Sequence, residues 1–407
     1  MFLEIVLFVF LGIFAGMITG LIPGLHPNTV FVMTLSLTFL LTGMHIYAVL
    51  AFIVSLAVSN TFFDFIPSIL FGAPEEDSVL SVLPGHRMLL DGRGYEALFM
   101  TVMGGLGVMF LTLLSLPALF YFLPLIYEMI KPGMHLLLLA VVVWMVFTEK
   151  GKRKFLAVFV FLLAGLFGFI TLNSVASDQA LFPAFTGLFG LSTIITSIMT
   201  RVRIPEQRIQ KEVKGNWLKG SLTGWLAGLL SGLLPGIGAS QAGVIAAQVL
   251  KAKLREFLIA LGGINTANIV FTFVVFYLIG KTRSGAVWLI SQVMDNFTSF
   301  DVSLLIIVTS VTCLISGILT LKTGRILLEK ITAINYTKTM FVIMAFLVVV
   351  VLLFTGFIGL LICATGVFLG LLAISAGIRR THLMGFLLLP TIFYFSGLSP
   401  AVLGILW

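Results

Sequence analysis

GIFAGMITGLIPG, residues Gly12–Gly24, is repeated 212 residues later as GWLAGLLSGLLPG, residues Gly224–Gly236. Seven of the thirteen positions are identical, and both copies end in Pro-Gly. Proline lacks the backbone N–H that a helix needs and glycine adds backbone freedom, so each copy is predicted to open a helix. In lipid, an opened backbone is tolerated only where it is buried in protein or lines a polar cavity. Paired breaks of this kind are typical of the substrate site of secondary transporters, so transport is our first hypothesis.

The composition predicts a membrane protein. Of 407 residues, 59% are hydrophobic and only 10% are charged, whereas a soluble chain carries about 25% charged residues. Many apolar stretches reach the roughly 20 residues that span a bilayer. The first stretch contains Glu4 and lacks the basic start of a signal peptide, so we interpret it as a membrane helix. We therefore expect an all-α polytopic membrane protein with multiple passes through the cell membrane.

Basic residues gather in a few loops, which the positive-inside rule places in the cytoplasm. The chain has no Lys or Arg before Arg87 or after Arg380, so both termini are expected outside. Residues 155–172 and 180–200 are predicted as one pair of crossings, and 338–355 and 357–376 as another. The basic stretch 201–219 is the predicted cytoplasmic linker between two repeats, residues 1–200 and 220–407. The basic clusters are Lys150–Lys154, Arg201–Lys219, Lys251–Arg255, Lys322–Lys330 and Arg379–Arg380.

The charges of the two halves predict inverted topology. The repeat continues beyond the first motif, with Asn60 matching Asn268 at an offset of 208. The basic loop Lys150–Lys154 corresponds to an uncharged segment around Gly356, so each half is positive where the other is not. This pattern favours two inverted-topology repeats. Each repeat is expected to contain a re-entrant Pro-Gly helical hairpin and a broken helix, with the breaks at Gly72–Asp77 and Gly280–Gly285.

The residues at each Pro-Gly and just after it form the predicted substrate site. The second arm of each hairpin begins there, and a helix N-terminus offers free N–H groups and a positive dipole end to a carboxylate or phosphate. The alternative is that the capped tips satisfy only each other. Two cations at the break in the second half could contact substrate, pair with acids or be interfacial. The predicted substrate-binding residues are Pro23, Gly24, His26, Asn28, Thr29, Pro235, Gly236, Gly238, Ser240, Gln241, Lys281 and Arg283.

Polar residues that follow the hairpins form the predicted coupling site. Oxygen atoms of Asn and Thr in an unwound membrane segment suit a sodium ion, and an acid in an apolar run suits a cation or a proton. Interhelical hydrogen bonding and capping are the structural alternatives. The predicted coupling residues are Asn60, Thr61, Asp64, Asn265, Thr266 and Asn268. We expect no resident metal and no cofactor apart from a bound Na⁺ or a transported H⁺. No catalytic set is expected, because HExxH, GxSxG and Walker motifs are absent from the sequence.

With these motifs the chain resembles the TctA-like large membrane subunit of tripartite tricarboxylate transporters, in its divergent archaeal-type members formerly of unknown function. The family's Gly-Ile-Pro-Gly-Ser appears here as GKTRSG, residues 280–285. The resemblance implies uptake of carboxylates coupled to sodium or protons, together with a small membrane subunit and an extracellular substrate-binding protein. The motifs that carry it are Gly20–Gly24 (GLIPG), Gly232–Gly236 (GLLPG), Phe71–Glu75 (FGAPE), Pro84–Gly94 (PGHRMLLDGRG) and Asn265–Asn268 (NTAN).

We therefore expect a secondary active transporter, a permease for a small organic anion such as a carboxylate, and not an enzyme. Elevator-like movement and a homodimer stay open, and no nucleic acid is expected as a partner. One alternative is a translocase of a lipid-linked phosphate such as a polyprenyl phosphate carrier, whose cavity would open sideways to lipid. The other is a membrane module that transports nothing and acts as an assembly partner.

Overall fold

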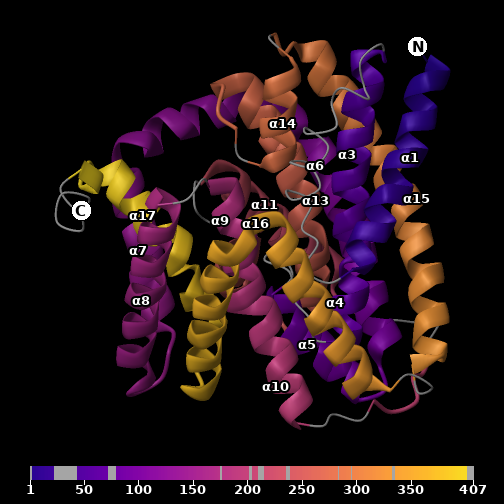
Figure 1. Cartoon of the computed structure of the whole chain (residues 1–407). Coiled ribbons are helices and arrows are strands. Elements are labelled where there is room, and N and C mark those ends of the chain that lie inside the picture. Colours follow the sequence, from indigo (N-terminus) through magenta and orange to yellow (C-terminus); the bar gives the residue numbers. More distant parts are fainter. Residues whose placement is uncertain are drawn as a thin grey trace.

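The fold is helical throughout the part of the chain that the structure describes (Figure 1). The structure is a computed structural model and describes residues 2–22, 44–71, 79–174, 177–200, 204–209, 215–234, 239–282, 284–294, 296–331 and 335–400. Three short turns, η2 (Lys131–Gly133), the π-helical η3 (Thr186–Leu191) and η5 (Arg380–Met384), join longer helices. The α-helices are α1 (Phe2–Leu21), α3 (Ile46–Phe63), α4 (Phe65–Phe71), α5 (Val79–Leu90), α6 (Gly94–Ile130), α7 (Met134–Phe147), α8 (Arg153–Ser174), α9 (Ser177–Phe185), α10 (Ser192–Thr200), α11 (Trp217–Leu233), α12 (Ala239–Val249), α13 (Leu254–Ile279), α14 (Gly285–Val293), α15 (Ser299–Glu329), α16 (Tyr336–Ser375) and α17 (Gly385–Ser396).

Eight helical runs in the described residues are long and apolar enough to cross a membrane. Their outer faces carry large exposed apolar side chains, for example Phe155 and Phe357, which are each 80% exposed. Such surface is stable in lipid and not in water. The expected all-α polytopic membrane class is therefore confirmed. The eight runs are Phe2–Leu21, Ile46–Leu70, Gly94–Phe147, Arg153–Ser174, Ala180–Met199, Leu254–Ile279, Ser299–Glu329 and Tyr336–Ser375.

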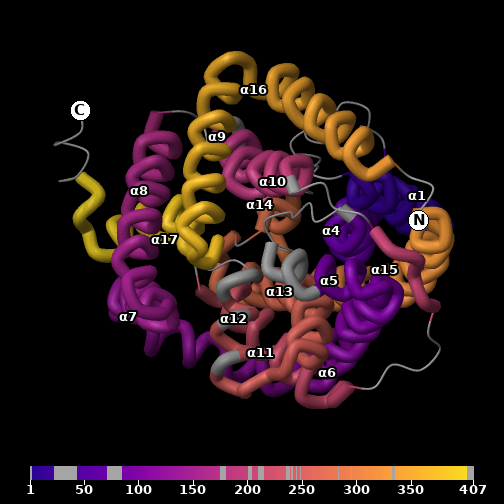
Figure 2. The backbone as a smooth tube through the Cα atoms, turned by 90° about the horizontal axis from the view of Figure 1, so that it is seen from below, coloured from indigo at the N-terminus to yellow at the C-terminus, as the bar shows by residue number. Residues whose placement is uncertain are grey.

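Packing divides the helices into two groups, which Figure 2 shows side by side. The α13 bundle consists of α1, α3–α6 and α11–α15, and the α16 bundle consists of α7–α10, α16 and α17. Within the first, α1 packs on α3, α11 on α13 and α13 on α6, while in the second α16 packs on α9 and α8 on α17. Both bundles contain helices from both sequence halves, so the packing groups do not follow the predicted repeats.

Glycines set the distance between the helices of two matched pairs in the α13 bundle. A methyl group on Gly12 of α1 would lie 2.6 Å from the carbonyl oxygen of Phe52 on α3. On α11, a methyl group on Gly224 would lie 2.8 Å from the carbonyl oxygen of Ala260 on α13. Small residues let membrane helices approach this closely. The four residues correspond at the offsets of 212 and 208 on which the repeat was aligned, so the α1–α3 and α11–α13 pairs pack alike.

The two pairs run in opposite directions across the molecule. In Figure 1, α1 begins at the upper side, where α14 lies after the end of α13. The ring of Tyr47 at the start of α3 is 5.6 Å from the ring of Phe300, which opens α15 just beyond α14. The start of α3 and the end of α13 therefore lie on one side of the molecule.

In each pair the chain comes back to the side from which it left. The backbone N–H of His45, just before α3, donates to Glu4 near the start of α1 at 3.0 Å. The side chain of Lys219 near the start of α11 donates to the carbonyl of Lys251, which follows α12, at 2.9 Å. α1 is therefore parallel to α3, and α11 is parallel to α13. α12 leads the chain back from the end of α11 to the start of α13 and contacts both helices.

The helix ends next to the basic clusters lie on the lower side of Figure 1. They include the start of α8, the ends of α10 and α15, and the start of α16. Arg379 joins this side because its backbone N–H and guanidinium contact Glu149 at the end of α7. We call this the basic side. Its position in the cytoplasm stays a prediction from the positive-inside rule.

The basic side is tied together by buried acids and by the linker. Glu96 at the start of α6 is 1% exposed and accepts hydrogen bonds from Arg93 at 2.7 Å, and it lies 2.9 Å from Arg255 of α13. In the described part of the linker, Gln207 accepts a bond from the Gly94 N–H at 2.9 Å. Its amide nitrogen donates to the carbonyl of Leu89 at 3.0 Å. The linker is therefore attached to the turn between α5 and α6.

A second buried group lies on the basic side of the α16 bundle. His382 is 1% exposed, and its Nε2 is 3.3 Å from a carboxylate oxygen of Glu149. Burial lowers the pKa of His382 below its ordinary value, and the neighbouring Glu149 offsets this only in part. The imidazole is therefore held neutral over a wider pH range than an exposed histidine.

Candidate functional site

The first predicted coupling residue, Asn60, links α3 to the last turn of α1. Its side chain is 1% exposed, and its amide nitrogen donates to the hydroxyl of Thr19 at 3.0 Å. The Thr19 hydroxyl in turn donates to the carbonyl of Gly16 at 3.2 Å. These two hydrogen bonds thus link α3 to the last turns of α1, close in sequence to the first Pro-Gly motif.

Its neighbours Thr61 and Asp64 are also buried. The Thr61 hydroxyl donates within its own helix to the carbonyl of Val58 at 2.8 Å, so the donor is already used. Asp64 is 2% exposed and lies at the single residue between α3 and α4, with its N–H donating to the Asn60 carbonyl at 2.9 Å. Asp64 therefore follows Asn60 by one helical turn, as expected. A carboxyl group at such a position is costly in a membrane protein and is usually functional.

The strongest sign of a site is on α13. Asn265 is 3% exposed, and neither its amide oxygen nor its amide nitrogen has a hydrogen-bond partner in the described structure. Among the same residues, the hydroxyl of Thr266, 1% exposed, and the amide oxygen of Asn268 also have no partner. Each unpaired buried polar group costs about 1–3 kcal/mol, so native proteins rarely keep one without an ion, a water molecule or a ligand to bind it.

Both sets of residues lie in continuous helices, so the expected unwound segment is wrong. α3 runs from Ile46 to Phe63 and α13 from Leu254 to Ile279 without a break. In lipid, a continuous helix satisfies its own backbone groups, and the apolar neighbours of these residues favour that state. A cation here could therefore be bound by side-chain oxygens but not by main-chain carbonyls.

Helix geometry separates the residues of α13 into two directions. Asn265 and Asn268 are three residues apart and share a face, whereas Thr266 is turned about 100° away from Asn265. A methyl group on Gly232, near the end of α11, would lie 3.5 Å from the Asn268 oxygen. Asn268 therefore faces α11 much as its match Asn60 faces α1.

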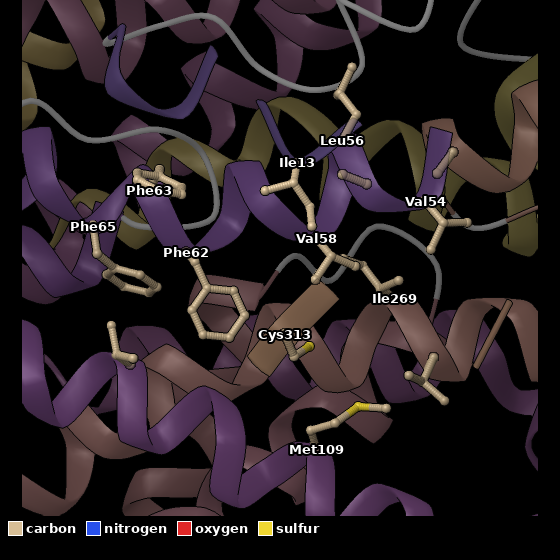
Figure 3. Close-up of a cluster of buried hydrophobic side chains, with 14 of the residues drawn as sticks. Ile13, Val54, Leu56, Val58, Phe62, Phe63, Phe65, Met109, Ile269 and Cys313 are labelled. Carbon is tan, nitrogen blue, oxygen red and sulfur yellow. The ribbon is translucent and has the colours of Figure 1, made fainter. Parts of the chain in front are cut away.

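An apolar core packs among the helices that carry the buried polar residues of α3 and α13. Figure 3 shows Val58 of α3 beside Ile269 of α13, with Cys313 of α15 and Met109 of α6 close by. Val58 and Cys313 are completely buried. In such a water-poor environment, electrostatic interactions with a bound ion are stronger than at a surface.

Sequence reasoning missed Thr19 and its match Ser231. The Ser231 hydroxyl donates to the carbonyl of Gly228 at 3.1 Å, which repeats the bond from Thr19 to Gly16 at the offset of 212. Both hydroxyls stand next to the last glycine before Pro-Gly in the repeated motif. A small polar residue kept at the same place in both copies was the signal that could have identified them.

Lys281, a predicted substrate-binding residue, lies apart from the buried polar residues of α13. It follows Gly280, which ends α13 with a left-handed φ of 69°, and it is exposed. The helix rise puts it roughly 24 Å along the axis from Asn265. Other predicted substrate residues lie outside the described residues, as do the side chains of Ser240 and Gln241, whose backbone belongs to α12. They are Pro23, Gly24, His26, Asn28, Thr29, Pro235, Gly236, Gly238 and Arg283.

The fold and the site define a polytopic helical membrane protein with polar side chains buried in the middle of its central helices. In the described ranges, no group of three His, Cys, Asp or Glu side chains could hold a metal ion. The acceptors that this site offers are amide and hydroxyl oxygens, together with the carboxyl group of Asp64. Such a site can bind a hard monovalent cation or exchange a proton.

The chain belongs to the tripartite tricarboxylate transporter TctA family, whose model matches residues 6–385. It is 30% identical over 401 residues to the uncharacterized protein MJ1079 of Methanocaldococcus jannaschii, which covers 96% of this chain and 98% of that relative. No solved structure matches the chain. The resemblance inferred from the sequence motifs is confirmed. Membership gives the protein the role of a membrane component of a tricarboxylate transport system, a role that is not enzymatic.

Proposed function

We propose that the protein is a secondary active transporter that takes up a small organic carboxylate together with Na⁺, and that Asn265 is a ligand of the ion. The observation that carries the proposal is the Asn265 side chain, which is 3% exposed with both amide atoms unpaired in the described structure. An amide oxygen is a hard, neutral ligand of the kind that sodium accepts in transporters. Binding the ion would offset the cost of burying that oxygen unpaired.

The matched positions support a site made by both repeats. Asn268 shares the face of Asn265, and its counterpart Asn60 lies one helical turn before Asp64, the residue that caps the end of α3. Asp64 would add the negative charge that a site of neutral oxygens lacks. If Asp64 exchanges a proton instead, H⁺ rather than Na⁺ drives transport.

The substrate would bind at the two Pro-Gly tips, which we propose to be re-entrant hairpins in inverted repeats. Support comes from the α1–α3 and α11–α13 pairs, which pack through glycines at matched positions and run in opposite directions (Figure 1). α11 has 17 residues and α12 has 11, and the bond between Lys219 and Lys251 joins the start of α11 to the chain just after α12. Two short helices that return to one side are the expected form of a re-entrant hairpin.

Transport would move the α13 bundle against the α16 bundle in an elevator-like way. The closest helix packing lies within each bundle, and the chain passes between them at α6–α7, at the linker and at α15–α16 (Figure 2). All candidate coupling residues lie in the α13 bundle. Family membership further suggests a small membrane subunit and an extracellular substrate-binding protein as partners.

The test is uptake of labelled citrate, succinate and phenylacetate into proteoliposomes that carry a sodium gradient or a pH gradient. We expect uptake of at least one carboxylate driven by sodium, and loss of the sodium dependence in Asn265→Ala. Thr309→Val is the control, because Thr309 is also fully buried but its hydroxyl is satisfied by the Leu305 carbonyl at 2.8 Å. If uptake is driven only by the pH gradient and is lost in Asp64→Asn, the coupling ion is H⁺ and not Na⁺. Absence of flux with every carboxylate and both gradients would refute the proposal.

A further inference from the structure

A pocket of about 690 Å³ lies where α6, α8, α13 and α17 end. The starts of α8 and α13 are near the basic clusters, so their far ends place this pocket on the opposite side of the molecule (Figure 1). Lys281 reaches it from the α13 bundle, and α8 and α17 line it from the α16 bundle. Its volume is typical of small-molecule sites, and such sites are common at the boundary between two packed units.

The charge of the pocket suits one carboxylate. Two lysines line it, Lys131 and Lys281. The Lys131 ammonium lies 3.5 Å from Glu128, which offsets its charge. Lys281 has no ion-pair partner in the described residues. The ends of α6, α8, α13 and α17 all add a partial negative charge, because helix C-termini carry the negative end of the dipole. A single ammonium group is therefore left for an anion, too little to balance three carboxylates.

The walls of the pocket are mostly apolar and aromatic, and Asn173, Thr391 and Ser399 add polar groups. The apolar and aromatic residues include Phe169 and Leu172 of α8 and Tyr394 and Phe395 of α17. The Tyr394 and Phe395 rings meet edge to face with their centroids 5.3 Å apart, and Phe169 meets Phe393 in the same way at 5.7 Å. Rings held in this way offer a preformed apolar surface to the body of a ligand.

From this charge and these walls we infer that the pocket binds an organic monocarboxylate with an apolar or aromatic body, whose carboxylate pairs with Lys281. This pocket is distinct from the proposed ion site at Asn265, because the pocket lies beyond the end of α13 and Asn265 lies within that helix. It would collect the cargo before the cargo reaches the middle of the α13 bundle. This role rests on the proposed function, whereas binding itself does not.

The test is binding of phenylacetate to the full-length protein in detergent micelles, followed by ligand-observed NMR. We expect phenylacetate to bind and equimolar citrate not to displace it. Lys281→Gln should weaken the binding about tenfold or more, the effect of losing one charged hydrogen bond. Glu128→Gln should strengthen it, because it frees Lys131. Lys338→Gln, at the start of α16 on the basic side, removes the same charge elsewhere and should change nothing.

Two results would overturn the inference. One is equal phenylacetate binding by the natural protein and Lys281→Gln. The other is displacement of phenylacetate by phosphatidylglycerol, but not phosphatidylcholine, in nanodiscs, which would make the pocket a site for anionic lipid. Uptake assays separate this inference from the proposed function. If sodium drives uptake but Lys281→Gln does not change phenylacetate binding, only the inference about the pocket is refuted. If Lys281→Gln weakens phenylacetate binding but no carboxylate is taken up, only the transport proposal is refuted.

Discussion

Compared with the natural protein, the Asn265→Leu variant should be more stable in the absence of sodium and less stable in its presence. The amide is 3% exposed and both of its polar atoms are unpaired in the described structure. Each such atom costs about 1–3 kcal/mol, so Asn265→Leu should recover about 2 kcal/mol or more. Leucine is somewhat larger, and overpacking takes back about 1 kcal/mol or more. The expected net gain in the free energy of unfolding is about 1 kcal/mol.

Sodium should reverse that order. A ligand that binds only the folded state adds about 2.7 kcal/mol of stability at a concentration a hundred times its dissociation constant. The natural protein should gain this amount, and the Asn265→Leu variant should gain nothing. The two stabilities should therefore cross as sodium replaces choline at constant ionic strength.

Thermal unfolding in detergent, followed through the five tryptophans of the chain, measures both effects. Thr309→Val serves again as the control and should keep the full response to sodium. Two results would refute the reasoning. In one, Asn265→Leu is less stable than the natural protein in choline, which would mean that the amide is satisfied in the folded state. In the other, sodium stabilises the variant as much as the natural protein, which would place the ion elsewhere.

Three further predictions concern the packing and the basic side. Gly262→Ala should cost about 3 kcal/mol, because its methyl group would meet the carbonyl of Thr101 where α6 crosses α13, and size-exclusion profiles should show loss of the folded peak. Glu96→Gln should lower the free energy of unfolding by about 1–3 kcal/mol, measured by the same thermal unfolding, since it deprives two arginines of their carboxylate. The lowered pKa of His382 means that the unfolded chain binds the proton more readily than the folded protein. Stability should therefore fall as the pH drops below about 6.5, and His382→Gln should show a flatter profile of thermal midpoint against pH.

Features set by local sequence could be predicted well. The helical membrane class follows from long apolar runs, and the end of α13 at Gly280 follows from a glycine that can take a left-handed conformation. The same holds for α16, where Gly356 has non-helical angles of 64° and −161° at the expected boundary between 338–355 and 357–376. In each case a residue type with a specific backbone preference marks the place.

Features set by packing could not be predicted. Asn60 and Asn265 looked like markers of unwound backbone, yet side-chain polarity says nothing about φ and ψ, and both lie in unbroken helices. The bond from Asn60 to Thr19 depends on how α1 meets α3, which the sequence of either helix does not state. The grouping into an α13 bundle and an α16 bundle likewise depends on contacts between distant segments.

The mixed origin of the two bundles has a consequence for how the protein is made. α1 and α3 emerge early from the ribosome, but the helices that complete their bundle extend to α15, which ends at Glu329. Until then, the face of α3 that later packs on α15 has no cover, and Ser55 lacks the Thr312 hydroxyl that it meets at 3.0 Å. We therefore expect that the first half does not fold as an independent unit. Separately expressed halves should be unstable alone and should recover a folded protein only when both are inserted into the same membrane.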